Sequence, residues 1–371
     1  MHKWHGTTTP FILHTLSLKQ GLFQPYLLAC QLPKSHWGRT PASVSIVEDK
    51  CDKATNNLRV IYNKPDEGEP KKKFAVCVKG LFFPFEDVSI RLAEWIELLH
   101  ELGAGTIYFY VQNIHDNVRK VLDLYEVRDW VDVRRTSFPG YFPGVPLAEL
   151  PSYWEQHKHE KRQLELVPYN DCFYRNIYRH QYIALLDIDE VIMPLKHTNW
   201  EDMMKEAVQS SLKVKNETRA SWNFRNVYFM DEMLDAHEHQ HFKDIPEYLH
   251  MMQHVYRSAN YTKPGQYVKC FHNPEKALIL HNHFPLGCLG GVCTSYPVDT
   301  GLAHLQHYRR DCVNTLKKSC ANDFKSNSVK DTSIWKVKDI VISRTNEALQ
   351  KLGFFGASSD RSQLATNSAI P

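Results

Sequence analysis

The stretch YIALLDIDEVIMP, residues 182–194, joins an apolar run to a group of acids. Residues 182–186 read as a buried strand, and Asp187, Asp189 and Glu190 follow it directly. An ionised carboxylate without a partner costs several kcal/mol in an apolar setting. The stretch therefore predicts a core strand whose end meets something positively charged.

Strands and helices alternate on both sides of this stretch. Helical spacing of apolar residues and terminal Gly or Asp residues mark the helices, and short apolar runs mark the strands. The predicted strands cover 74–81, 106–113, 131–138, 182–186 and 221–230, with short ones in 266–271 and 276–284. The predicted helices cover 86–103, 116–126, 170–180 and 199–212. This order predicts an α/β fold with a mostly parallel central sheet and helices on both faces.

Three regions follow from shifts in composition. Residues 1–73 contain short β-like pieces and a linker rich in Pro, Gly and charge, which predicts a small β-rich N-terminal module. Residues 74–354 form the α/β domain, in which 138–154 is expected to be a long loop rich in Pro and aromatic residues. Residues 355–371 are small and polar and are expected to be disordered.

The overall composition limits the classes of function. The chain has 371 residues, of which 43% are hydrophobic and 23% charged, so it can bury a large core. Its formal net charge is only +3, and the one short basic run is Lys71–Lys73. A nucleic-acid partner is therefore not expected.

The spacing of Asp187 and Asp189 points to a metal ion. Residues two apart in an extended strand point to the same side, and ligands of parallel sheets bind at the carboxyl ends of strands. Two converging carboxylates repel each other unless a cation lies between them, and hard oxygen ligands suit Mn²⁺ or Mg²⁺. Such an ion would hold a diphosphate. The plainer alternative is a pair of acids that caps the following turn.

Two classes of enzyme place Asp-x-Asp after a buried strand. In dehalogenase-type phosphatases the first Asp attacks phosphorus, but that strand opens the core domain, whereas here several strands and helices precede it. Metal-dependent nucleotide-sugar glycosyltransferases place the motif after a first nucleotide-binding half of about 100 residues. The distance from Phe74 to Asp187 fits the second class better.

Several segments resemble glycosyltransferase family 92. They are FAVCVKGLF, RLAEWIELLHELGAGTIYFYVQN, VLDLYE, NDCFYRNIYRHQYIALLDIDEVIMP and AHLQHYRRDC, in order within residues 74–313. The resemblance implies a GT-A type nucleotide-sugar-binding fold, a UDP-galactose donor, Mn²⁺ and inversion at the anomeric carbon. It also implies β-1,4 transfer to a galactose- or fucose-ended glycan in the Golgi lumen. A catalytically inactive carbohydrate-binding relative is the further alternative.

The resemblance also suggests roles for residues at the metal. Asp187 would face the ribose and the metal, and Asp189 would bind the metal directly. A histidine near the end of the domain would be a further ligand. His307 is the first choice, with His304 or His283 as alternatives.

The donor is expected to contact strand ends in the first half of the domain. The candidates there are Val78, Lys79, Gly80, Gln112 and Asn113. Arg309, and Arg310 beside it, could pair with phosphate oxygens, because the guanidinium fork matches them.

The acceptor hydroxyl needs a base to take its proton. Asp231 is the first candidate because it follows an apolar strand directly, and Glu232, Asp235 and Glu275 remain open. Glu94 matches the family pattern, but helix packing is its simpler interpretation.

Cysteines and sequons favour a lumenal, oxidising compartment. Four of the nine cysteines, Cys288, Cys293, Cys312 and Cys320, are gathered in one region and are expected to form disulfides, whereas Cys77 is expected to be buried and free. N-glycosylation sequons begin at Asn216 and Asn260.

Two further segments are singled out and set aside. Residues 11–30 come nearest to a membrane span, but polar residues interrupt them, so no clear anchor or signal peptide is expected although the family implies one. The stretch HEHQH, residues 237–241, could suggest zinc, but its polar flanks favour a mobile loop.

Overall fold

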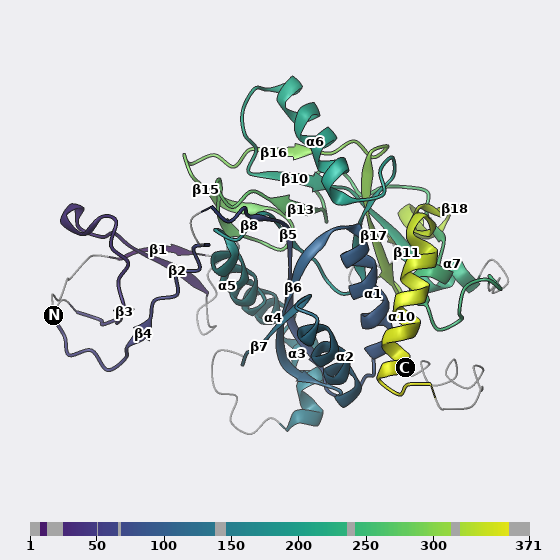
Figure 1. Ribbon diagram of the computed structural model, residues 1–371, viewed down its shortest axis with the longest axis horizontal. Helices are drawn as coiled ribbons and strands as arrows, with labels where there is room; N and C mark the ends of the chain where they lie inside the picture. The colour runs from purple at the N-terminus through teal and green to yellow at the C-terminus, as the bar shows by residue number, and fades with distance from the viewer. Residues whose placement is uncertain are drawn as a thin grey trace.

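A seven-stranded sheet forms the centre of the protein (Figure 1). The computed structural model describes residues 8–12, 25–49, 51–65, 68–137, 146–235, 242–312 and 320–355. The strand order in the sheet is β16-β10-β13-β8-β5-β6-β7. The α/β class with a mostly parallel central sheet and covering helices is confirmed, as expected for a GT-A type fold.

The first half of the sheet is built from consecutive units. Its strands pair in parallel and are β5 (Lys72–Phe83), β6 (Ala104–Ile114), β7 (Val131–Arg135) and β8 (His180–Leu185). The helices between them include α1 (Ser89–Leu102), α2 (Asp116–Val127) and α5 (Leu166–Asn176). α1 stops at Gly103, whose φ of 116° suits glycine. These elements match the predicted ones, although α5 begins and ends four residues earlier than expected.

The second half pairs segments that are distant in the chain. β10 (Ser221–Phe224) is antiparallel to β13 (Lys269–His272) and parallel to β16 (Ser295–Pro297). β11 (Asn226–Met230), β17 (Ala303–Arg309) and β9 (Glu190–Pro194) form a separate three-stranded sheet. The single strand predicted over 221–230 is wrong, because Arg225 separates two strands that have different partners.

Several shorter elements complete the domain. The helices are α3 (Leu150–Gln156), α4 (Lys158–Leu164), α6 (Trp200–Val214), α7 (Asp231–Asp235), α8 (His250–Gln253) and α10 (Lys338–Lys351). The strands are β12 (Tyr256–Ser258), β14 (Ala277–Leu280), β15 (Pro285–Cys288) and β18 (Ser328–Lys330). Single turns of other helix types cover Lys34–His36, Leu147–Glu149, Ala321–Lys325 and Ser333–Val337. α3 corrects the expected loop over 138–154, because its helical turn begins inside that range.

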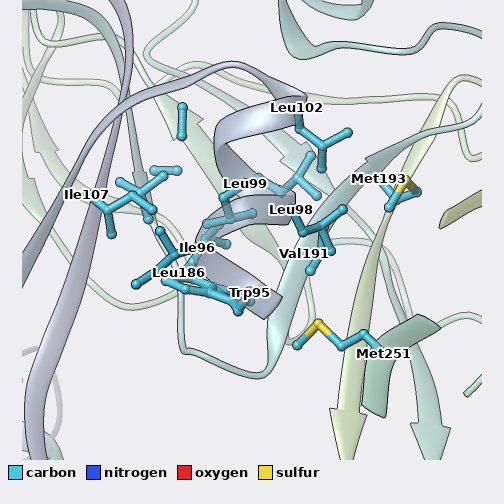
Figure 2. Close-up of a cluster of buried hydrophobic side chains, with 14 of the residues drawn as sticks. Trp95, Ile96, Leu98, Leu99, Leu102, Ile107, Leu186, Val191, Met193 and Met251 are labelled. Carbon is cyan, nitrogen blue, oxygen red and sulfur yellow. The ribbon is translucent and has the colours of Figure 1, made fainter. Parts of the chain in front are cut away.

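The main core surrounds α1, which α10 flanks (Figure 1). Trp95 and Leu98 are fully buried, and they lie near Val191 and Met193 of β9 (Figure 2). The Trp95 indole N–H donates to the backbone carbonyl of Glu190 over 2.9 Å. The core therefore holds the backbone of the acidic stretch in place through Trp95.

Disulfides join three pairs of cysteines in the described part of the chain. Cys288–Cys293 and Cys312–Cys320 confirm the expectation for the clustered cysteines. Cys77 is buried as expected, but it is not free, because it is bonded to Cys172 of α5. This correction could not be read from spacing, since the two cysteines are 95 residues apart.

The N-terminal residues form two small antiparallel pairs beside the main body (Figure 1). They are β1 (Thr8–Ile12) with β2 (Tyr26–Cys30), and β3 (Ser43–Val44) with β4 (Leu58–Arg59). Tyr62 contacts Tyr178 edge-on at 5.3 Å between ring centroids. Among the described residues, no helix has the length and apolar character needed to cross a bilayer. The predicted tail and the HEHQH stretch lie outside the described residues, apart from the first residue of the tail.

Candidate active site

The acidic stretch forms a tight link between the two sheets. β8 ends at Leu185 and β9 begins at Glu190. The Glu190 carboxylate accepts the backbone N–H of Asp187 over 2.9 Å, and the Glu190 N–H donates to the Asp187 carbonyl over 3.0 Å. The Tyr308 N–H donates to the Asp189 carbonyl over 2.8 Å. This link lies at the carboxyl end of β8, where the sequence placed it.

The Asp187 carboxylate lies between two ammonium groups. Lys79 Nζ is 3.1 Å from Oδ1, and Lys269 Nζ is 3.4 Å from Oδ2. The Tyr169 hydroxyl donates to Oδ1 over 3.2 Å. Burial alone would raise the pKa of Asp187, but the charges of Lys269 and Lys79 hold it well below its usual range. Asp187 is therefore ionised, and the two ammonium groups compensate its negative charge.

Lys269 is the centre of this charge cluster. Its side chain is completely buried, and its Nζ lies 2.9 Å from Glu190 Oε2 as well as near Asp187. It also donates to the Asn282 side-chain oxygen. Burial would lower the pKa of Lys269, but Asp187 and Glu190 raise it. One ammonium group thus compensates two buried carboxylates.

Asp189 has a different environment from Asp187. Its side chain is 44% exposed, against 17% for Asp187. Its Oδ2 lies 3.4 Å from His307 Nε2, and the other ring nitrogen of His307 lies 3.3 Å from Asn226 Nδ2. Burial would lower the pKa of His307, but Asp189 and Glu190 raise it. Asp189 and His307 therefore form a pair, the open pair, that is open to solvent on the Asp189 side, whereas the His307 side chain is only 16% exposed.

The structure distinguishes among the three candidate histidines. His304 is buried and contacts the Tyr261 hydroxyl at 3.1 Å. His283 lies 2.9 Å from the Val268 carbonyl through its Nδ1. Only His307 of these three is paired with Asp189. Within the described residues, no group of three or more His, Cys, Asp or Glu side chains is arranged to hold a metal ion.

The predicted donor residues lie on the neighbouring strands β5 and β6; Val78, Lys79 and Gly80 do not end their strand as expected, because β5 continues to Phe83. Lys79 takes part in the charge cluster, whereas the Val78 side chain is buried in the core. Gly80 and Gln112 approach closely, because a Cβ on Gly80 would lie 2.9 Å from the Gln112 amide nitrogen. Asn113 pairs with Phe82 in the same part of β6. The guanidinium of Arg309 lies over the Tyr228 ring at 5.8 Å from its centroid, and Arg310 is exposed.

The candidates for the catalytic base differ in the side chains with which they pair. Asp231 Oδ1 lies 3.3 Å from His250 Nε2, and its side chain is 38% exposed. Burial would raise the pKa of Asp231, but the bond to His250 lowers it below its ordinary value. Glu232 is paired with Lys325 at 2.5 Å, and Glu275 is paired with Lys71 at the opposite end of β5. The side chain of Asp235 lies outside the described residues.

Glu94 supports the segment that carries His250. Its carboxylate is completely buried and accepts the backbone N–H groups of Met251 and Met252, over 3.1 and 2.9 Å. Burial raises the pKa of Glu94 to about 7, although these N–H bonds oppose the shift. Glu94, a residue of α1, thus holds the first turn of the short helix α8 in place. This role goes beyond the helix packing that the sequence suggested for Glu94.

Sequence reasoning missed several residues of the site. They are Tyr169, His250, Lys269 and Asn282. One signal was present for Lys269, which is the one charged residue of the predicted short strand QYVKCF. A lysine in a buried strand requires a carboxylate, but nothing in the sequence says which one.

The whole central region matches one family of enzymes. The model of glycosyltransferase family 92 matches residues 72–345, so the chain belongs to this family. A search of curated proteins gave no match.

Comparison with solved structures gives only remote likeness. TarS of S. aureus matches with 12% identity and a TM-score of 0.23, over 43% of this chain and 22% of that one. The bifunctional glycosyltransferase WbbM matches with 9% identity and a TM-score of 0.22, over 46% of this chain and 26% of that one. The chain thus spans about a quarter of the length of these relatives, and at such TM-scores they carry no argument about its site.

Proposed function

We propose that this glycosyltransferase is metal-dependent and inverting, and that it transfers galactose from UDP-galactose in β-1,4 linkage to a galactose- or fucose-ended glycan. The observation that carries the proposal is the open pair of Asp189 and His307 beside the neutralised Asp187. The donor sugar, linkage and acceptor rest on the family alone.

The open pair fits a divalent ion in part. Asp189 would supply a hard oxygen ligand and His307 a nitrogen, a combination that favours Mn²⁺ over Mg²⁺. The two side chains leave most coordination positions to phosphate oxygens and water. When bound, the ion would act as a Lewis acid that stabilises charge on the departing diphosphate. Asp187, which Lys79 and Lys269 already neutralise, would face the ribose.

Asp231 is the proposed base. Its lowered pKa keeps it ionised at neutral pH, and His250 fixes one of its oxygens. It would take the proton of the acceptor hydroxyl while that oxygen bonds to the anomeric carbon and the bond to UDP breaks. Attack from the face opposite UDP inverts the configuration at that carbon.

The phosphatase alternative has less support. Asp187 would have to attack phosphorus in such an enzyme. Its carboxylate is largely buried and held by two ammonium groups and a tyrosine hydroxyl. Membership of the glycosyltransferase family argues in the same direction.

We also propose that the enzyme works in the Golgi lumen. Disulfides in the described residues suit an oxidising compartment. The full-length transcript, expressed in its own cells, should yield a protein that enters the secretory pathway and keeps its disulfides. A fully reduced cytosolic product would contradict this part of the proposal.

Calorimetry of UDP binding tests the central claim. Wild-type protein is titrated with UDP in Mn²⁺ and in EDTA, followed by transfer assays with a panel of UDP- and GDP-sugars. We expect tight binding only with Mn²⁺ and transfer only from UDP-galactose. Equal affinity in EDTA would reject the metal role, and binding without transfer would favour the inactive relative.

A further inference from the structure

The two N-glycosylation sequons lie in different environments. Asn216 follows the end of α6, in a bend of the chain, and both it and Thr218 are exposed. The backbone nearby is held by a bond from the Glu217 N–H to the Lys215 carbonyl, over 2.8 Å. The acceptor amide and the hydroxyl of this sequon therefore both face solvent.

The second sequon is bonded into the fold, although Asn260 is itself exposed. The Asn260 side-chain amide donates to the carbonyl of Asp323 over 2.7 Å. Thr262 is only 1% exposed, and its hydroxyl accepts the backbone N–H of Asn226 over 3.3 Å. A sugar on Asn260 would replace a proton of the amide that makes the first of these bonds.

The segment around Asn260 also supports the candidate active site. Thr262 holds Asn226 at the start of β11 through two bonds, since its N–H also donates to the Asn226 carbonyl over 3.0 Å. Asn226 in turn lies against His307 through its side chain. A glycan at Asn260 would therefore be attached two residues from Thr262, whose bonds hold the residue that contacts His307.

Asn216 lies at the other end of the central sheet. A cavity of about 280 Å³ next to it is lined by Glu217 and Thr218 together with Lys71 and Gln181. Lys71 precedes β5 and Gln181 is the second residue of β8. Asp187 follows the opposite end of β8, so a glycan on Asn216 would extend away from the candidate active site.

We propose that Asn216 is the N-glycosylation site of this protein and that Asn260 remains unmodified. The donor is an oligosaccharide carried on a lipid diphosphate, the substrate class used for sequons in the secretory pathway. The Asn216 amide nitrogen bonds to the anomeric carbon, the bond from that carbon to the diphosphate oxygen breaks, and the nitrogen loses one proton. The lipid diphosphate leaves. This inference goes beyond the proposed transfer reaction; it rests on the proposed lumenal location and not on that reaction.

Site occupancy can be measured on the intact protein. The full chain is secreted from eukaryotic cells behind a cleavable signal, and its peptides are mapped after enzymatic removal of glycans in ¹⁸O-water, which converts each glycosylated Asn to labelled Asp. We expect the label at position 216 and unlabelled Asn at position 260. No glycan at Asn216, or a glycan at Asn260 in folded protein, would overturn the proposal.

Two matched variants extend the test. Asn216→Gln should remove the whole glycan mass and leave UDP affinity within about twofold of wild type, because the sequon lies away from the site. Asn260→Gln should leave the glycan mass unchanged. Because this second variant also breaks a native hydrogen bond, the mapping of wild-type peptides decides the question if the variant fails to fold. Neither result depends on whether galactose is transferred.

Discussion

The two ends of β8 treat buried ionisable groups in opposite ways. At the amino end, His180 is 1% exposed, neither ring nitrogen has a hydrogen-bond partner, and burial lowers its pKa to about 3. At the carboxyl end, Asp187 is also buried, but Lys269 and Lys79 keep it ionised. The buried group at the amino end of β8, His180, is therefore neutral, whereas the buried group at the carboxyl end, Asp187, is charged and stabilised. Stabilised buried charge marks the end at which a charged ligand would bind.

The largest effect is expected from removing the central cation. Lys269→Met leaves Asp187 and Glu190 buried without their shared ammonium group, and breaking such a pair typically costs about 3–5 kcal/mol. Urea unfolding should show this loss. The control is Lys71→Met, which removes an exposed ion pair at the amino end and should change stability by less than about 1 kcal/mol. Equal losses in both variants would show that the two ends do not differ.

The next effect concerns activity rather than stability. Asp189→Asn should lower galactose transfer by a factor of about 10²–10³, or roughly 3–4 kcal/mol, through lost stabilisation of the departing diphosphate. Its melting temperature should stay near that of wild type, because the Asp189 side chain is 44% exposed. Asp187→Asn serves as the comparison and should lower the melting temperature, because Lys79 and Lys269 lose their partner. Transfer by Asp189→Asn at the wild-type rate would make the open pair a structural feature.

A smaller effect is expected from the disulfide between β5 and α5. Replacing Cys77 and Cys172 by Ala removes a cross-link between residues 95 apart, which typically costs about 2–4 kcal/mol. Replacing Cys288 and Cys293 by Ala opens a link across a separation of only 5 residues and should cost less. Unfolding of both double variants in urea checks the order. The reverse order would mean that local strain, and not chain length, decides the outcome.

The smallest effect tests the neutral end of β8. Unfolded His180 takes up a proton near pH 6.5, whereas the folded residue does so only near pH 3. The free energy of unfolding therefore falls as the pH drops below 6.5, by about 2 kcal/mol at pH 5 from this group. His180→Leu should lose less stability than wild type between pH 7.5 and pH 5. Identical pH profiles would mean that His180 takes up its proton at the same pH in the folded and the unfolded protein.

The two halves of the sheet differ in how far the sequence predicted them. Between Lys72 and Leu185 the predicted strands and helices follow local hydrophobic periodicity and are confirmed, although α3 and α4 were not predicted. β10, β11 and β13 depend on pairing between distant segments, which periodicity cannot show. The helix α10 was not predicted at all.

The same reason limits prediction of the site. The Asp-x-Asp spacing predicts the carboxyl end of β8, and the family resemblance indicates His307, whose Nε2 lies 3.4 Å from Asp189 Oδ2. Lys269 and His250 reach the site from other segments of the chain, so no spacing within the motif could reveal them. The charge of Lys269 lowers the pKa of Asp187, and the hydrogen bond from His250 lowers the pKa of Asp231, so the sequence alone could not predict the protonation state of either carboxyl group.

The position of Lys269 also affects how fragments of this gene should be judged. A transcript that ends before β13 still encodes YIALLDIDEVIMP, and a motif search would count its product as an enzyme. That product would carry the buried carboxylates of Asp187 and Glu190 but not the lysine that both of them contact. We expect that product to misfold and to be degraded, and not to act as a catalyst. For truncated copies of this chain, the presence of Lys269 is a better criterion of a working gene than the acidic motif itself.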